Sequence, residues 1–143
     1  MPSDDPVVLD THVWLGVALG RERSVATRVR RKIERAAALD SLYVAAITPW
    51  EIAMLARAGR IRITGPVLEF VTASLRDTRT AVAGLDPAVA IDAAHLPAWE
   101  HRDPADRMIV ATARNLGAVL VTRDAAILDY GARSNAVRVL EAR

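Results

Sequence analysis

Short apolar runs alternate along this chain with longer stretches in which apolar residues recur at helical spacing. Such short runs are typical of strands that are buried on both faces. The predicted strands cover residues 7–9, 42–47, 80–85, 118–122 and 136–140. The predicted helices cover residues 12–19, 24–39, 48–58, 66–75, 87–96, 104–116 and 124–130. This alternation predicts an α/β fold in which helices cover both faces of a mostly parallel central sheet.

Residues with known capping preferences mark several of the helix boundaries. An Asp-Pro pair at residues 86–87 is a start signal, and Gly117 follows the helix predicted to end at residue 116. Residues 48–51 have the sequence Thr-Pro-Trp-Glu, which matches a capping box with proline at the first helical position. We therefore expect this motif to begin the helix that follows the second strand.

Composition narrows the class of protein. The chain has 143 residues, of which 52% are hydrophobic and 25% charged, as is typical of one globular domain. We predict a single domain over residues 1–143. The absence of cysteine excludes disulfide bonds, thiolate-bound metals and a cysteine nucleophile. No uncharged run approaches the ~20 residues of a membrane-spanning helix, so we expect no membrane association and a cytoplasmic location.

The basic residues exclude one large class of enzymes. The formal net charge is +2, and Lys32 is the single lysine among 19 basic residues. A P-loop nucleotidase needs its lysine directly after a glycine-rich turn, which Lys32 lacks. Arginine prefers planar partners such as phosphate and carboxylate groups, so the composition favours nucleic acid or an acidic partner. The arginines of residues 21–35 form either a solvated helix face or a surface that follows a phosphate backbone.

Acidic residues stand close to the ends of the predicted strands. Asp10, Glu51 and Asp124 each follow a strand, and Asp106 lies in the first turn of the helix before the fourth strand. The carboxyl ends of parallel strands meet at one edge of a sheet, so we expect these acids to lie together. Crowded carboxylates repel one another, and a hard cation such as Mg²⁺ or Mn²⁺ removes that conflict.

Some of these residues also have a purely structural explanation. Asp10, Asp103 and Asp124 stand where helix N-caps are expected, and capping is compatible with metal ligation. The three histidines lack the spacing of a zinc site, and we expect them at the surface or in loops: His12, His95 and His101. The three tryptophans lie in apolar contexts and are predicted to be core residues: Trp14, Trp50 and Trp99.

Four segments, in order and over nearly the whole chain, are similar to one known family. LDTHVWL at residues 9–15 resembles the start of PIN-domain nucleases. WEIA at residues 50–53, continuing to AGRI, resembles the second-acid helix of the VapC-type toxins of toxin–antitoxin systems. HRDPADR with IVATA at residues 101–113 resembles the third-acid segment, and LVTRD at residues 120–124 resembles the fourth.

The resemblance implies a PIN-like three-layer α/β/α fold and a metal-dependent endoribonuclease. The acids of the family map onto four residues: Asp10, Glu51, Asp106 and Asp124. Asp10 and Asp106 are the expected central ligands of one or two Mg²⁺ or Mn²⁺ ions, which activate water for attack on phosphorus. Glu51 would bind the cation or orient the water, Asp124 would complete the outer part of the site, and Thr122 would support it. The resemblance further implies an RNA substrate, a small cognate antitoxin and a homodimer.

Two other functions would share some of these features. A haloacid-dehalogenase-type phosphatase begins with an aspartate at a strand end, but it needs a second acid two residues later, where His12 stands, and a supporting lysine. A non-catalytic PIN-like module that binds RNA or a partner would not need the complete set of acids. Toxins and housekeeping nucleases would both carry these motifs, which also leave the RNA target open.

Overall fold

A computed structural model describes residues 4–143 of the chain, without the side chain of Glu22. The elements are, in order, β1 (Val7–Leu9), α1 (Thr11–Ala18), the 3-10 turn η1 (Glu22–Ser24), α2 (Thr27–Ala38), β2 (Leu42–Ala45), α3 (Ile47–Arg57), α4 (Val67–Asp77), β3 (Ala81–Ala83), α5 (Pro87–Ala94), α6 (Pro104–Leu116), β4 (Val119–Thr122), α7 (Ala125–Ser134) and β5 (Arg138–Glu141). Every predicted strand and helix is present, with boundaries displaced by a few residues.

The five strands form one sheet in the order β3-β2-β1-β4-β5, and every neighbouring pair is parallel. Val7 of β1 pairs with Leu42 of β2 on one side and with Val119 of β4 on the other. The chain first builds outward from β1 to β3 and then returns to place β4 against the free side of β1. In open parallel sheets, ligands bind at the carboxyl ends of the strands where the strand order reverses in this way.

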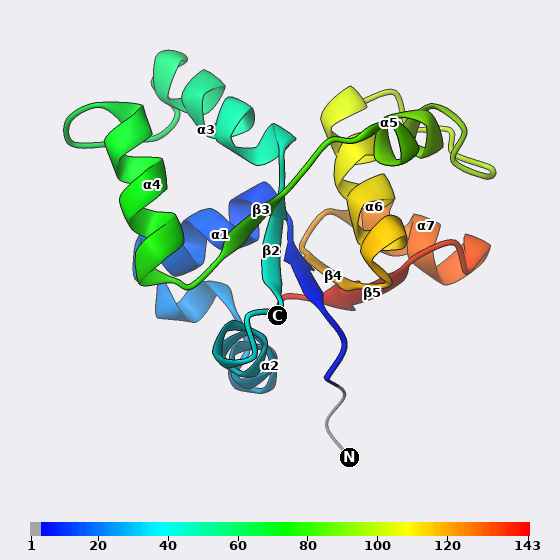
Figure 1. Cartoon of the computed structure of the whole chain (residues 1–143), viewed down its shortest axis with the longest axis horizontal. Helices are drawn as coiled ribbons and strands as arrows, with labels where there is room; N and C mark the ends of the chain where they lie inside the picture. The colour runs from blue at the N-terminus through cyan, green and yellow to red at the C-terminus, as the bar shows by residue number, and fades with distance from the viewer. Residues whose placement is uncertain (1–3) are drawn as a thin grey trace.

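Two layers of helices cover the two faces of the sheet (Figure 1). Successive strand residues point to opposite faces. Val7 and Leu9 therefore pack into a core with residues of α1 to α4, while Val8 packs into a second core with residues of α5 to α7. This arrangement is the predicted three-layer α/β/α fold. None of the helices within residues 4–143 combines the length and the apolar character that a bilayer crossing requires.

The prediction for the tryptophans is wrong at one position. Trp14 and Trp99 are buried, but the side chain of Trp50 is 56% exposed. Trp50 and Ile52 both lie on α3, and side chains two positions apart in a helix point in directions that differ by about 200° around its axis. Because Ile52 packs fully into the core, Trp50 points toward solvent.

The predicted N-caps are confirmed, but the predicted capping box is not. Asp86 accepts a hydrogen bond from the backbone N–H of Val89 over 3.0 Å at the start of α5. The helix α3 instead begins at Ile47, and no side chain caps it. Thr48 lies inside the helix, where its hydroxyl pairs with Oγ1 of Thr11 at 2.9 Å. A tertiary contact thus replaces the local cap.

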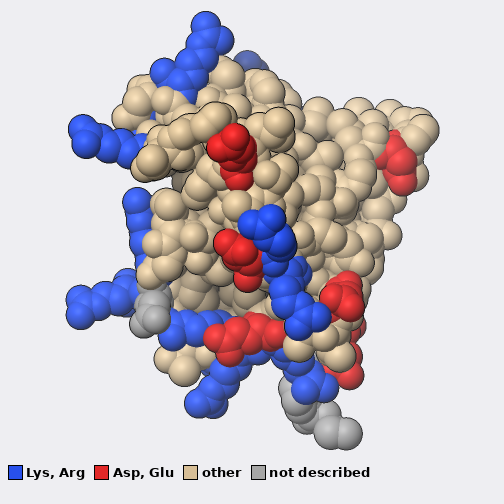
Figure 2. Space-filling model, turned by 60° about the vertical axis from the view of Figure 1, so that its left-hand side comes forward, with Lys and Arg blue, Asp and Glu red and all other residues tan. Residues whose placement is uncertain are grey.

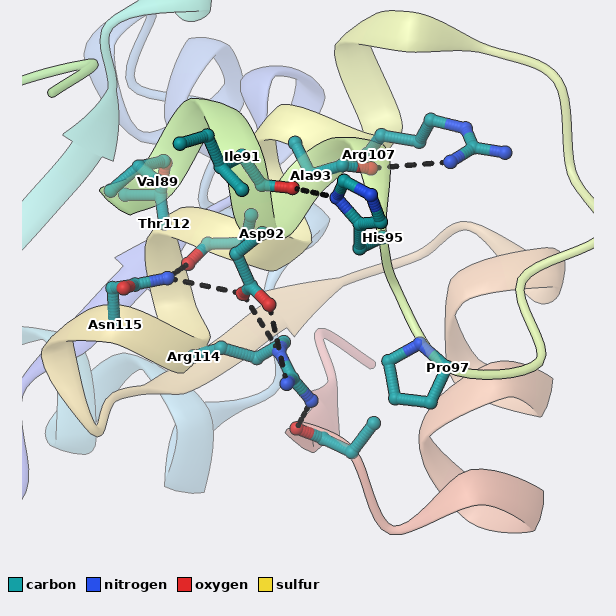
Figure 3. Close-up of polar contacts among 12 residues, drawn as sticks. Val89, Ile91, Asp92, Ala93, His95, Pro97, Arg107, Thr112, Arg114 and Asn115 are labelled. Carbon is teal, nitrogen blue, oxygen red and sulfur yellow. Dashed lines mark hydrogen bonds and ion pairs between the residues drawn. The ribbon is translucent and has the colours of Figure 1, made fainter. Parts of the chain in front are cut away.

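Polar contacts fasten α5 to α6, the helix that carries Asp106 (Figure 3). The carboxylate of Asp92 accepts hydrogen bonds from Nε of Arg114 over 2.9 Å and from Nδ2 of Asn115 over 3.1 Å. Near the start of α6, Nη1 of Arg107 donates to the carbonyl oxygen of Ala93 over 3.1 Å. These contacts fix α6 along its length, so its first turn has a defined position beside the sheet.

Candidate metal centre

The structure brings the four predicted acids together around one open cavity of about 440 Å³. Asp10 directly follows β1, and Asp124 stands two residues after the end of β4. Glu51 comes from α3 and Asp106 from α6. The cavity therefore lies at the carboxyl edge of the sheet, where β1 and β4 meet. The other residues that line it are His12, Asp103 and Arg123.

Two threonines hold the acid that follows β1. The carboxylate of Asp10 is buried, and its Oδ1 accepts the backbone N–H of Thr11 over 2.8 Å. Its Oδ2 accepts the hydroxyl of Thr122 over 2.7 Å. Oγ1 of Thr122 also accepts the backbone N–H of Asp124 over 3.0 Å. The fully buried Thr122 therefore links two of the four acids, as expected from the supporting position assigned to it.

Glu51 is oriented from the start of α1. Its Oε1 accepts the hydroxyl of Thr11 over 2.5 Å. Because Thr11 has one hydroxyl hydrogen, which it gives to Glu51, the hydroxyl of Thr48 must donate to Oγ1 of Thr11. A chain of two hydroxyls thus runs from α3 through α1 and back to the carboxylate of Glu51.

Asp124 and Asp103 combine helix capping with a place in the cavity wall. Oδ1 of Asp124 accepts the backbone N–H groups of Ala126 and Ile127 over 2.8 and 3.1 Å. Oδ1 of Asp103 accepts the N–H of Ala105 over 2.9 Å at the start of α6. Both caps use a single carboxylate oxygen, so capping is compatible with a second task for the same side chain.

The site raises the pKa values of three of its carboxyl groups. Burial is the largest cause at Asp10, Glu51 and Asp106. For Asp106, the charges of Asp103, Asp124 and Asp10 add to the effect and raise its pKa to about 7 from the usual 3.8. Hydrogen bonds from Thr122 and Thr11 partly offset the rise at Asp10, and the one from Thr11 does so at Glu51. Burial and mutual repulsion therefore disfavour the ionised forms of these carboxyl groups.

Three residues of this region were not predicted as part of a site. Asp103 lines the cavity in addition to capping α6, and the exposed His12 lines it from the first turn of α1. Nε2 of His101 lies 3.1 Å from Oδ2 of Asp106. The signal for Asp103 is its spacing of three from Asp106, since residues three apart share one face of a helical turn. Nothing local in the sequence indicates the contact of His101.

The donor groups suit a hard divalent cation. Within residues 4–143, no arginine or lysine forms an ion pair with a carboxylate of the cavity wall. His12 and His101 lower the pKa values of these acids in part, but no guanidinium or ammonium group of the described residues offsets their repulsion through an ion pair. Carboxylate oxygens are the ligands that Mg²⁺ and Mn²⁺ prefer. Ligand atoms of His101, Asp103 and Asp106 also lie within 4.8 Å of one another. The residues present thus fit a bound cation.

A comparison with known domains identifies the family of this chain. The PIN domain model matches residues 7–132, and the chain belongs to the PIN domain family. The chain is 41% identical over 120 residues to ribonuclease VapC22 of Mycobacterium tuberculosis (strain ATCC 25618 / H37Rv), an alignment that covers 82% of this chain and 86% of that protein.

Solved structures support the same fold. A chain of the structure of VapBC2 from Rickettsia felis, bound to a DNA fragment from the VapBC2 promoter, matches with a TM-score of 0.69 at 13% identity. The match covers 96% of this chain and 98% of that one. A chain of a toxin–antitoxin complex from Klebsiella pneumoniae matches with a TM-score of 0.58 at 16% identity, with the same two coverages. At these identities the likeness concerns the fold.

Proposed function

We propose that this chain is a metal-dependent endoribonuclease and the toxin of a type II toxin–antitoxin pair. Four carboxylates line one cavity, two from α3 and α6 and two from the residues that follow β1 and β4, and this observation carries the proposal. The name of the 41% identical relative, a ribonuclease, supports RNA as the substrate. In this proposal the whole chain, residues 1–143, acts as a single PIN-like domain.

We propose that Asp10 and Asp106 are the central ligands of Mg²⁺ or Mn²⁺ and that Asp124 completes the outer part of the site. Glu51 binds the cation or orients the attacking water. When bound, such a cation polarises water and the scissile phosphate and offsets the charge of the leaving oxygen. The two hydrogen bonds to Asp10 orient its carboxylate in advance. Arg123, at the cavity wall, is placed to pair with a phosphate.

A nuclease assay with a four-acid variant tests this function. We expect the wild-type chain to cleave RNA with Mg²⁺ or Mn²⁺ and to stop when EDTA is added. The variant with Asp10→Asn, Glu51→Gln, Asp106→Asn and Asp124→Asn should fold and be inactive. Cleavage that survives EDTA or these four changes would contradict the proposal. A folded wild-type chain that binds RNA without cleaving it would favour the non-catalytic module, and hydrolysis of p-nitrophenyl phosphate would favour the phosphatase.

We propose that a small antitoxin covers an apolar groove beside the acids. The groove has a volume of about 270 Å³ and is lined by His12, Glu51 and Arg60 and by apolar residues of α3 and of the position just after it. Among these, Trp50 is 56% and Met54 is 42% exposed. Exposed apolar surface of this kind suits a protein partner, and an arginine of that partner would pair with the adjacent carboxylates. Trp50→Ser should abolish capture of the cognate antitoxin, whereas Leu39→Ser, which removes another exposed apolar residue, should not.

We also propose that the chain forms a homodimer. Three exposed apolar side chains belong to the edge strand β3, the loop after it and the helix α5: Val82, Leu85 and Ile91. Burying them against a second copy would cover both the apolar side chains and the free strand edge. Size-exclusion chromatography with light scattering should give the mass of a dimer, and Ile91→Asp should shift it toward the monomer. A clean wild-type monomer at high micromolar concentration would contradict this assembly.

A further inference from the structure

His101 contacts one oxygen of Asp106, an acid of the proposed cation site. Its Nε2 lies 3.1 Å from Oδ2 of Asp106, whose side chain is 11% exposed. Asp106 must be ionised to bind a cation, and an ionised carboxylate can only accept hydrogen bonds. In that state Nε2 of His101 therefore carries the hydrogen of this contact. With Oδ2 held in this way, the carboxylate loses its freedom to rotate about its terminal torsion. Oδ1 is then the oxygen that Asp106 presents to a ligand.

The loop that carries His101 is fixed by α7. The hydroxyl of Tyr130 donates to the carbonyl oxygen of Pro97 over 2.7 Å, and Nη1 of Arg133 donates to that of Ala98 over 3.2 Å. Ala98 adopts a left-handed backbone conformation with φ 54°, which residues other than glycine rarely take. Such a conformation persists where the surrounding contacts determine it. The contacts from α7 therefore hold this loop in a defined path.

A series of edge contacts between aromatic rings extends this support to His101 itself. The ring of Trp99 is buried and lies edge-on to the ring of Tyr130, with a centroid distance of 4.7 Å. The ring of Trp99 also makes an edge contact with the ring of His101, with a centroid distance of 5.8 Å. Edge contacts of this kind are a preferred geometry for aromatic rings. The position of His101 is thus fixed from α7 through Trp99 as well as by the backbone.

We propose that His101 is a positioning residue of the cation site, which fixes the carboxylate of Asp106 so that Oδ1 is preset to bind a divalent cation. Groups that hold a ligating carboxylate in this way commonly contribute about 10–100-fold to metal affinity. This inference rests on the proposed function, because it assigns a task to His101 only if Asp106 ligates a cation. It adds a fifth side chain, from a separate loop, to the four acids.

Isothermal titration with Mn²⁺, in the absence of RNA, tests this role without relying on activity. His101→Phe keeps an aromatic ring against Trp99 but removes the N–H donor, and we expect its Kd for Mn²⁺ to rise roughly 10-fold or more. His101→Gln places an amide N–H near the position of Nε2, and we expect it to restore the affinity to within about 3-fold of wild type. Rescue by glutamine distinguishes hydrogen bonding to Asp106 from a general effect on the loop.

The chain offers a matched control at the other end of the same loop. The exposed His95, which directly follows α5, bonds through Nδ1 to the carbonyl oxygen of Ile91 in that helix (Figure 3). His95→Phe should leave the affinity for Mn²⁺ unchanged. If His101→Phe binds Mn²⁺ as tightly as the wild type does, the inference is wrong. Pulsed electron paramagnetic resonance of the Mn²⁺-loaded wild type should show no nitrogen coupling that depends on His101. An imidazole coupling that His101→Phe abolishes would make His101 a ligand and overturn the positioning role.

One further variant separates the failure of this inference from the failure of the site. Asp106→Asn should abolish the tight binding of Mn²⁺, because it removes the charge of the proposed ligand. If the wild type binds Mn²⁺ and Asp106→Asn does not, the cation site stands, and the His101→Phe result alone decides the role of His101. If the wild-type chain does not bind Mn²⁺, both the proposed site and this inference are overturned.

Discussion

Thr122 donates a hydrogen bond over 2.7 Å to Oδ2 of Asp10, although the two residues are 112 positions apart in the chain. Both side chains are buried, and the contact joins the carboxyl ends of β1 and β4. The same hydroxyl accepts the backbone N–H of Asp124. Thr122, which is not itself a proposed cation ligand, therefore sets the geometry of two acids in the proposed cation site.

Thr122→Val should impair both folding stability and activity. The substitution keeps the shape of the side chain but leaves a buried carboxylate without one donor, at a cost of about 1–3 kcal/mol in the free energy of unfolding. The hydrogen bond from Thr122 lowers the pKa of Asp10, so its loss should raise that pKa further and move the acid limb of the pH–rate profile to higher pH. We expect cleavage to fall by roughly 10-fold or more.

Thr112→Val is the matched control for this prediction. Thr112 is also buried, but its hydroxyl donates only to the carbonyl oxygen of Met108 in its own helix. We expect this variant to cleave RNA at the wild-type rate. Equal activity of the two valine variants in cleavage assays would show that the bond from Thr122 to Asp10 is not needed.

The metal-free protein should lose stability as the pH rises from about 4 to 7. In the folded state the pKa of Asp106 is raised from 3.8 to about 7, so across this range the folded chain holds a proton that the unfolded chain has released. Folding then takes up a proton, and the free energy of unfolding falls as the pH rises. The raised pKa values of Asp10 and Glu51 act in the same direction.

Asp106→Asn should therefore stabilise the metal-free protein at pH 8 while removing its activity. Relieving the buried charge should raise the Tm by roughly 3–10 °C and flatten its dependence on pH. Calorimetry in EDTA at pH 5 and pH 8 measures both effects. Asp77→Asn, at an exposed position, should change neither. A lower Tm for Asp106→Asn at pH 8 would mean that the repulsion among these acids is not a cost to the folded state.

Arg123 should contribute to RNA binding more than the basic helix α2 does. Figure 2 shows basic side chains at the lower end of the molecule, where α2 lies, with acidic ones among them. Arg35 of this helix forms an ion pair with Asp4 over 2.7 Å. Asp4 stands just before β1, so this ion pair lies at the opposite edge of the sheet from the acids of the cavity. This ion pair raises the pKa of Arg35. Arg123 instead lines the acidic cavity.

Salt titrations separate the two arginines. In a non-cleaving Asp106→Asn background, Arg123→Ser should reduce the slope of log K against log salt by about 0.7, the value for one contact to a single-stranded phosphate. Arg35→Ser should leave the slope unchanged. Fluorescence anisotropy with a labelled RNA measures both slopes, and the reverse pattern would place the RNA along α2.

The features that local sequence determines were predicted correctly. Buried strands such as 7–9 are recognisable because both of their neighbouring faces are covered, so every residue is apolar. The caps at Asp103 and Asp124 are contacts over two or three residues. Because parallel strands end at one edge, the sequence also predicted that Asp10 and Asp124 would lie together.

The features that depend on distant partners were not predictable in the same way. Thr48 and Glu51 have the pattern of a capping box, but their hydrogen bonds go to Thr11 on another helix. The contact of His101 with Asp106 depends on a loop whose path is set by α7. Trp50 lies in an apolar stretch, and only the orientation of α3 against the core shows that it faces solvent.

The rates of RNA cleavage by Asp106→Asn, Glu51→Gln and Asp103→Asn at saturating Mn²⁺ test the central claim most directly. Asparagine caps a helix about as well as aspartate, and glutamine still accepts the hydroxyl of Thr11. All three variants should therefore fold. Asp106→Asn and Glu51→Gln should lose on the order of 100-fold or more in rate, because a hard cation loses a charged ligand, while Asp103→Asn should stay within about 3-fold of wild type. An inactive Asp103→Asn beside an active Asp106→Asn would exchange the roles of the two residues, and full activity in all three would contradict the carboxylate site itself.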